Sequence, residues 1–77
     1  MPTIYREGPF RFFFNSREES RLHVHVESTE GLAKFWLEPI VALAVHHRLN
    51  APDLARIENI VKEHRDDFIA AWRAHLG

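Results

Sequence analysis

Apolar and polar residues alternate along three segments in the first half of the chain, as they do in β-strands with one buried face. These segments are 10–14 (FRFFF), 21–27 (RLHVHVE) and 33–38 (AKFWLE). Polar residues 15–20 and 28–31 separate them, which predicts an antiparallel meander with a hairpin loop at 15–20. Residues 3–7 (TIYRE), followed by the turn signal Gly8-Pro9, are a candidate short first strand.

Residues 39–49 (PIVALAVHHRL) fit two structures. Pro39 suits the first turn of a short helix, whereas the apolar run also fits a fourth buried strand. The run is too short for its periodicity to decide. We expect an extended segment that leads into a turn, in which His46 and His47 are solvated.

Residues 50–77 predict one amphipathic helix of about six turns. Asn50 is a good N-cap, and Pro52 and Asp53 suit the first turn. Apolar residues then recur at three- and four-residue steps, and His64 lies among them as a partly buried core histidine. The stripe consists of Leu54, Ile57, Ile60, Val61, His64, Phe68, Ala71, Trp72 and His75.

The predicted helix and the predicted strands each have one apolar face, so we expect these two faces to pack against each other. The inward face of the sheet consists of Phe10, Phe12, Phe14, Leu22, Val24, Val26, Ala33, Phe35 and Leu37. The predicted fold class is α+β with two layers: a small antiparallel sheet of three to four strands, covered on one face by a long C-terminal helix. We expect a single domain over 1–77, with the sheet region at 1–49 and the helix at 50–77.

Composition narrows the function classes. The 77 residues include no Cys, which excludes disulfides and thiolate–zinc sites, and the net charge of −1 gives no global attraction to nucleic acid or membrane. The N-terminal residues lack the apolar core of a signal peptide, and no apolar run could span a bilayer. These features predict a cytoplasmic protein without a membrane partner, and no feature of the sequence indicates a cofactor.

The outward face of the predicted sheet is the unusual feature of the sequence. Its predicted binding surface consists of Arg11, Phe13, His23, His25, Lys34 and Trp36. Aromatic residues and Arg are enriched at the centres of protein interfaces. A small domain also gains stability from association. We therefore expect a protein partner or self-association.

Two other functions use the same face. In a nucleic-acid-binding protein, Phe13 and Trp36 would stack on bases. The phosphate contacts would be Arg11, Arg21 and Lys34. A metal-independent ribonuclease would use the candidate catalytic residues His23, His25 and Lys34: the imidazoles as general acid and base, and Lys34 to stabilise the transition state. Cross-strand pairing on an exposed sheet explains the same residues without either function.

A metal site is the last alternative. His23 and His25 lie on one side of one strand, and Glu27 follows two residues later as a third candidate ligand. An alternating strand with a polar solvent face produces the same pattern without a metal.

Several motifs together resemble a known family. They are the opening MPTI, the run GPFRFFF at 8–14, HVHV at 23–26, AKFWLEP at 33–39 and a final helix with Phe68 and Trp72. The chain resembles a family of small bacterial proteins of the type DUF4160, a domain of unknown function. Arg21 and Leu22 stand where family members usually have prolines. Residues 46–49 replace a turn that contains Gly, which leaves the conformation of 40–50 open.

The resemblance implies a function only in outline. Genes of such proteins often neighbour the gene of a second small domain, which suggests a toxin–antitoxin-like module, and no established activity comes with the family. We expect an interaction protein of such a two-gene module. The alternatives are the nucleic-acid-binding protein or ribonuclease and, after these, the histidine metal site.

Overall fold

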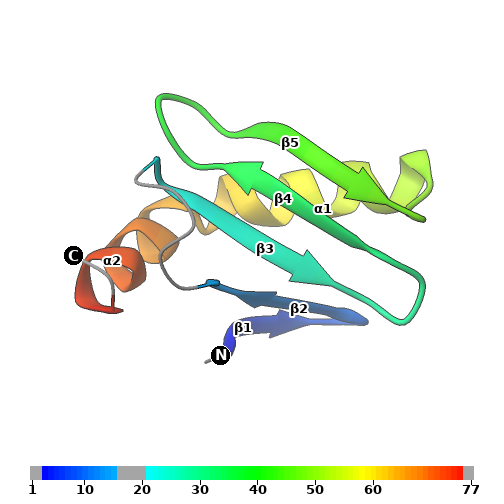
Figure 1. Ribbon diagram of the computed structural model, residues 1–77, viewed down its shortest axis with the longest axis horizontal. Coiled ribbons are helices and arrows are strands. Elements are labelled where there is room, and N and C mark those ends of the chain that lie inside the picture. The colour runs from blue at the N-terminus through cyan, green and yellow to red at the C-terminus, as the bar shows by residue number, and fades with distance from the viewer. Residues whose placement is uncertain (1–2, 16–20, 76–77) are drawn as a thin grey trace.

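The computed structural model describes residues 3–15 and 21–75, and the first half of this chain forms one antiparallel sheet. Each strand pairs with the next along the chain, in the order β1-β2-β3-β4-β5 (Figure 1). The strands are β1 (Thr3–Glu7), β2 (Phe10–Phe13), β3 (His23–Glu27), β4 (Leu32–Trp36) and β5 (Ala42–His47). Most of the predicted hairpin loop at 15–20 lies outside the described residues.

The sheet has five strands, so the prediction of three to four was too low. The candidate strand at 3–7 is confirmed as β1, and the ambiguous segment 39–49 contributes β5 after a bend at 38–40. β5 was hard to predict because it is not a buried strand: from Leu43 to His47 every residue is exposed. Its apolar run therefore faces solvent rather than the core.

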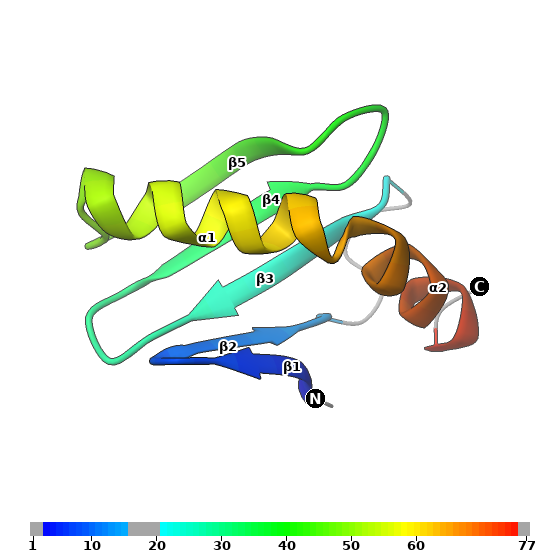
Figure 2. The same cartoon turned by 180° about the vertical axis from the view of Figure 1, so that it is seen from behind.

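Two helices follow, where one was predicted. They are α1 (Ala51–Glu63) and α2 (Arg65–His75), and Asn50 caps α1 as expected, its Oδ1 accepting a hydrogen bond from the Asp53 amide at 2.8 Å. The axis bends at His64, where ψ is 15°. Figure 2 shows α2 leaving the direction of α1 and turning past the end of the sheet.

Two contacts with the sheet hold the bend. The apolar periodicity of residues 50–77 does not reveal either contact. The Arg65 Nε donates to the Leu37 carbonyl oxygen at 2.8 Å, and the Tyr5 ring packs against the His64 ring with centroids 4.3 Å apart. Because β1 and the end of β4 fix these two neighbours, the second helix follows the sheet rather than the axis of α1.

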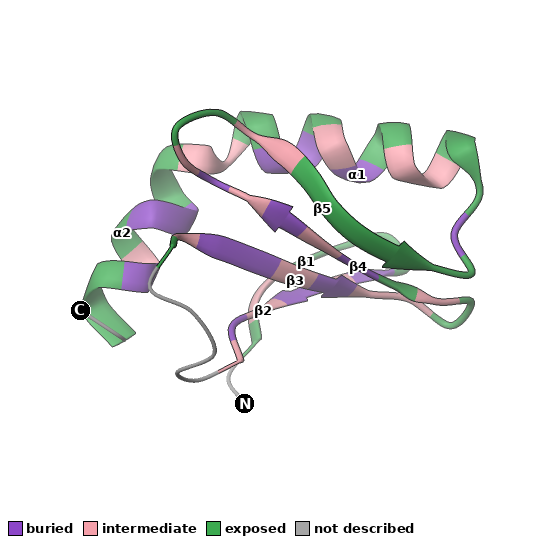
Figure 3. Ribbon diagram, turned by 45° about the horizontal axis from the view of Figure 1, so that its top comes forward, coloured by how far each residue is buried: buried purple, intermediate pink, exposed green. Residues whose placement is uncertain are grey.

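The core lies between the sheet and the two helices (Figure 3). Val24 and Val26 of β3 are fully buried, as strand alternation predicts, and Phe12 of β2 packs on Phe68 of α2 with ring centroids 5.5 Å apart. The buried apolar residues are Phe10, Phe12, Phe14, Val24, Val26, Ala33, Phe35, Leu37, Leu49, Ile57, Ile60, Val61, Phe68, Ile69 and Trp72. The two-layer α+β class is therefore confirmed. Among the described residues, no helix has the length and apolar character needed to cross a membrane.

Candidate functional site on the outer face of the sheet

The register of the strands arranges the outer face in rows that cross the sheet. One row joins Phe13, His25, Lys34 and Val45, and each residue pairs with the next across β2, β3, β4 and β5. The neighbouring row joins Arg11, Glu27, Leu32 and His47. Residues 30 or more positions apart in sequence therefore lie on one surface, which we call the outer face.

Phe13 and its neighbours form the first cluster on this face. The Phe13 ring stacks on the His25 imidazole with centroids 5.5 Å apart. The Arg11 guanidinium lies 4.6 Å from the centre of the Phe13 ring, and Arg11 also forms an ion pair with Glu27. A cation over a ring and a carboxylate beside it fix the guanidinium in one position.

Trp36 is the centre of a second cluster. The Arg21 guanidinium lies 4.2 Å and the Lys34 ammonium 4.6 Å from the centre of its ring. Arg21 Nε also donates to the Glu38 carbonyl oxygen at 3.0 Å. The half-buried indole is thus held in place while two cations surround it. Such a preorganised aromatic residue is typical of an interface anchor.

His23 departs from the prediction. Its imidazole does lie beside His25 and Trp36, at 5.1 Å and 5.9 Å between ring centroids, but the side chain is fully buried. The ring of Trp72 from α2 packs against it at 5.0 Å. The prediction that both imidazoles are exposed is therefore wrong for His23. The contact that the sequence did not predict is the one with Trp72, which lies in the helix after the bend at His64.

The backbone also fixes the His23 ring. His23 Nδ1 lies 2.7 Å from the Arg21 carbonyl oxygen, and since a carbonyl only accepts, Nδ1 carries the hydrogen in this contact. His23 is thus a histidine of the core and contributes no accessible nitrogen to the outer face.

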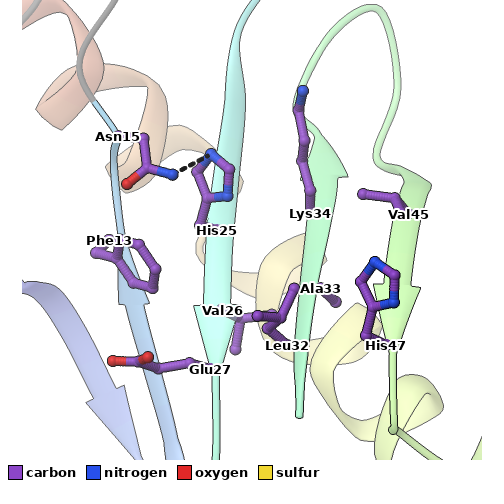
Figure 4. A pocket seen from close by; sticks show the side chains of 10 residues that line it. All are labelled: Phe13, Asn15, His25, Val26, Glu27, Leu32, Ala33, Lys34, Val45 and His47. Atoms are coloured by element: carbon purple, nitrogen blue, oxygen red, sulfur yellow. Dashed lines mark hydrogen bonds between the residues drawn. The ribbon is translucent and has the colours of Figure 1, made fainter. Parts of the chain in front are cut away.

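A groove of about 340 Å³ runs along the outer face from β2 to β5 (Figure 4). In it, the Asn15 Nδ2 and the His25 Nε2 lie 3.3 Å apart, so the amide donates and the imidazole accepts in this orientation. The lining residues are Phe13, Asn15, His25, Val26, Glu27, Leu32, Ala33, Lys34, Val45 and His47.

Sequence reasoning placed four members of this groove, Phe13, His25, Glu27 and Lys34, on the outward face, and it missed Asn15, Leu32, Val45 and His47. The last two belong to β5, and only assigning that segment as a strand would have revealed them. Asn15 was assigned to a loop.

Four large apolar side chains are exposed along β5 and its neighbour β4. Their exposed fractions are 48% for Leu32, 70% for Ile40, 40% for Leu43 and 44% for Val45. Leu32 lies in β4, which is the neighbour of β5. Ile40, Leu43 and Val45 lie in or just before β5, which is the edge strand of the sheet. We call these four residues the apolar edge. Leu32 and Val45 line the groove together, whereas Leu43 pairs with Phe35 and belongs to the opposite face of the sheet. Large apolar residues that share an exposed surface, as Leu32 and Val45 do, typically mark an interaction site.

The structure does not bring the candidate metal ligands together. His23 and Glu27 lie at opposite ends of β3, and they do not form a group with His25 whose ligand atoms are close. Among the described residues, one other set does so: Glu7, Glu63 and His64, whose ligand atoms lie within 4.8 Å of one another. The two glutamates are exposed, and exposed acidic groups are common without a metal, so this set alone does not establish a site.

Tyr5 lies beside that set. Its hydroxyl donates to the Glu7 Oε1 at 2.6 Å, and its ring contacts His64. The hydrogen bond to Glu7 raises the pKa of Tyr5 above its usual value of 10.0, and the negative charges of Glu7 and Glu63 act in the same direction. The sequence pattern could not show this cluster, because it depends on the contact between β1 and the bend of the helices.

A comparison with protein families finds a match for residues 9–73, and the matching family is described as "Domain of unknown function (DUF4160)". The chain belongs to this family. The matched range contains every residue of the predicted binding surface, from Arg11 to Trp36, and extends into α2. Neither the curated proteins nor the solved structures contain a match. The family resemblance is confirmed, and it brings no assigned activity.

Proposed function

We propose that this DUF4160 protein is an interaction protein that binds a partner protein through its outer face and apolar edge. The observation that carries the proposal is the apolar edge. Leu32 and Val45 lie on the same face as the Trp36 and Phe13 clusters, and both remain largely exposed. Burying them against a partner would remove apolar area from water, at about 25 cal/mol per Å² before the costs of association.

The composition of this surface supports a protein partner. Trp36 and Phe13 provide large rings that are already fixed by cations, so that little side-chain freedom is lost on binding. Arg11 and Arg21 supply donors at the rim. The combination of fixed aromatic anchors, Arg and exposed aliphatic residues matches the composition of interface centres.

The partner that we propose is the product of a neighbouring gene. This part rests on what the family resemblance implies: small bacterial proteins whose genes often neighbour that of a second small domain, in modules that resemble toxin–antitoxin pairs. We propose that this chain is one half of such a two-gene module and acts in the cytoplasm.

Co-expression with the product of the adjacent gene tests the proposal. We expect the two proteins to co-purify as a complex of fixed stoichiometry. Trp36→Ala should weaken the complex about tenfold or more, the effect typical of an aromatic anchor. Asp66→Ala, on the far exposed side of α2, is the matched control and should leave binding unchanged. No complex in any co-expression would contradict the proposed function.

Nucleic-acid binding is the second candidate. The observation that favours it is the groove, whose lining includes Lys34 and the Phe13 ring, stacked on His25. The ribonuclease form of this proposal loses one of its residues, because His23 is buried and cannot reach a substrate. A titration with single-stranded RNA tests the binding: an affinity that falls steeply with salt and is lost in Phe13→Ala supports it, and no binding at low salt contradicts it.

A further inference from the structure

We infer that β5 is the docking strand of this protein: an extended segment of the partner, with acidic and apolar residues in alternation, pairs with β5 as a sixth strand. This inference rests on the proposed function and specifies the edge and the chemistry of the partner. Strand addition of this kind takes its affinity from main-chain hydrogen bonds and its specificity from alternate side chains.

The position of β5 in the sheet makes strand addition possible. β5 is the last strand in the order, and within the described residues it pairs only with β4. It is six residues long and ends at His47, and the next residue, Arg48, has a φ of 58° that turns the chain away from the strand direction. An edge strand is a template for another strand where charge, proline, a bulge or a cover does not interrupt it. The pairing of β5 with β4 skips Ala44, so β5 has two regular parts, Ala42 to Leu43 and Val45 to His47.

The side chains of β5 do not protect it. Ala42, Leu43, Ala44 and Val45 carry no charge, and Leu43 and Val45 are both at least 40% exposed. Leu43 pairs with Phe35 and Val45 with Lys34, so the two side chains belong to opposite faces of the sheet. An added strand would therefore find apolar contacts on both faces.

The other edge of the sheet differs. β1 carries the charged residues Arg6 and Glu7, and its apolar residues Ile4 and Tyr5 already pack against the core. Glu7 also lies close to Glu63, so an acidic segment would be repelled there. The comparison favours β5 as the docking edge.

The cations beside β5 favour an acidic partner. No Asp or Glu occurs between Glu38 and Asp53, and Arg48 follows the last residue of the strand. Lys34 lies next to Val45 on the neighbouring strand. A second copy of this chain would present the same segment without acidic residues, so a different protein with acidic side chains complements β5 better.

A titration with two synthetic peptides of strand length tests this inference. In one, Glu alternates with Val; in the other, Lys replaces Glu. We expect the Glu peptide to bind about tenfold or more tightly than the Lys peptide at low salt. It should slow amide hydrogen exchange within residues 42–47 and not within residues 3–7. Val45→Glu should reduce its affinity, because it removes an apolar contact and repels the acidic peptide, and the control Ala70→Glu, exposed on α2, should not.

Three results would overturn the inference: equal affinity for both peptides, protection of β1 in place of β5, or concentration-dependent pairing of β5 with a second copy. The same exchange measurement on the complex with the adjacent gene product separates the two proposals. If that complex forms while residues 42–47 stay unprotected, the docking strand is wrong and the interaction function stands. If the Glu peptide protects β5 but no complex forms, the docking strand stands and the proposed module is wrong.

Discussion

The His23 imidazole lies edge-on against the Trp72 indole, with ring centroids 5.0 Å apart, and this contact ties β3 to α2. Strand alternation assigns His23 to the outer face, yet its side chain is fully buried, and Trp72 of the second helix is one of the rings that pack on it. The contact divides the two histidines of HVHV into a core residue and a surface residue.

Replacing His23 should therefore cost stability. In His23→Ala the packing against Trp72 and Trp36 is lost and a cavity remains, so we expect a loss of about 2–4 kcal/mol in the free energy of unfolding. His25→Ala, on the same strand but half-buried, is the control and should cost about 1 kcal/mol or less. Urea denaturation followed by circular dichroism measures both. Equal losses would show that His23 is not part of the core.

The start of α1 gives a second prediction. The Asn50 side chain accepts a hydrogen bond from the Asp53 amide, and Asn50→Ala removes that acceptor. We expect a loss of about 1 kcal/mol in the free energy of unfolding. The control is Asn59→Ala on the exposed side of the same helix, which should be neutral or slightly stabilising because Ala favours helix. A neutral Asn50→Ala would mean that the cap contributes nothing.

Gly31 lies where the β3–β4 turn approaches the end of β5. A methyl group there would overlap the His47 carbonyl oxygen, and it would lie 2.9 Å from the Arg48 carbonyl carbon. Since backbone must move to make room, Gly31→Ala should destabilise the protein by about 2 kcal/mol or more. It should also shift the amide resonances of residues 45–48. Unchanged resonances and stability would contradict this close approach.

The hydroxyl of Tyr5 gives a prediction for alkaline pH. Because the folded pKa is raised, the contact with Glu7 stabilises the fold below pH 10.0, and this contribution is lost as the pH rises through the folded pKa. Tyr5 is the single tyrosine, so absorbance near 295 nm follows its ionisation directly. We expect a midpoint above 10.0 that moves down in Glu7→Ala. An unchanged midpoint in Glu7→Ala would contradict the assigned hydrogen bond.

The sequence predicted most of the fold because each layer has a regular apolar pattern. The alternation of β2, β3 and β4 and the stripe from Ile57 to Trp72 survive in the structure as the two sides of the core. The Asn50 cap and the Glu58–Lys62 ion pair, at 2.9 Å, depend on local spacing and were also predictable. His64 is a partly buried core histidine, as expected.

What the sequence missed depends on contacts between distant segments. The bend at His64 arises where Arg65 meets the Leu37 carbonyl and Tyr5 meets the His64 ring, and neither contact leaves a periodic signal. The Trp72 ring that packs on His23 lies in the helix after that bend. β5 was ambiguous because an exposed edge strand does not show the alternation that buries one face. The sequence therefore predicted the part of the site on β2, β3 and β4. It did not predict the apolar edge.

The most direct test of the interaction function is the affinity of the adjacent gene product for the wild-type protein and for Val45→Glu, measured by isothermal titration calorimetry. The Val45 side chain is exposed, so the substitution should leave the free energy of unfolding within about 0.5 kcal/mol of wild type. We predict an affinity at least about tenfold lower for Val45→Glu and an unchanged affinity for Ala70→Glu. Wild-type affinity in Val45→Glu, or no binding by the wild-type protein, would contradict the account.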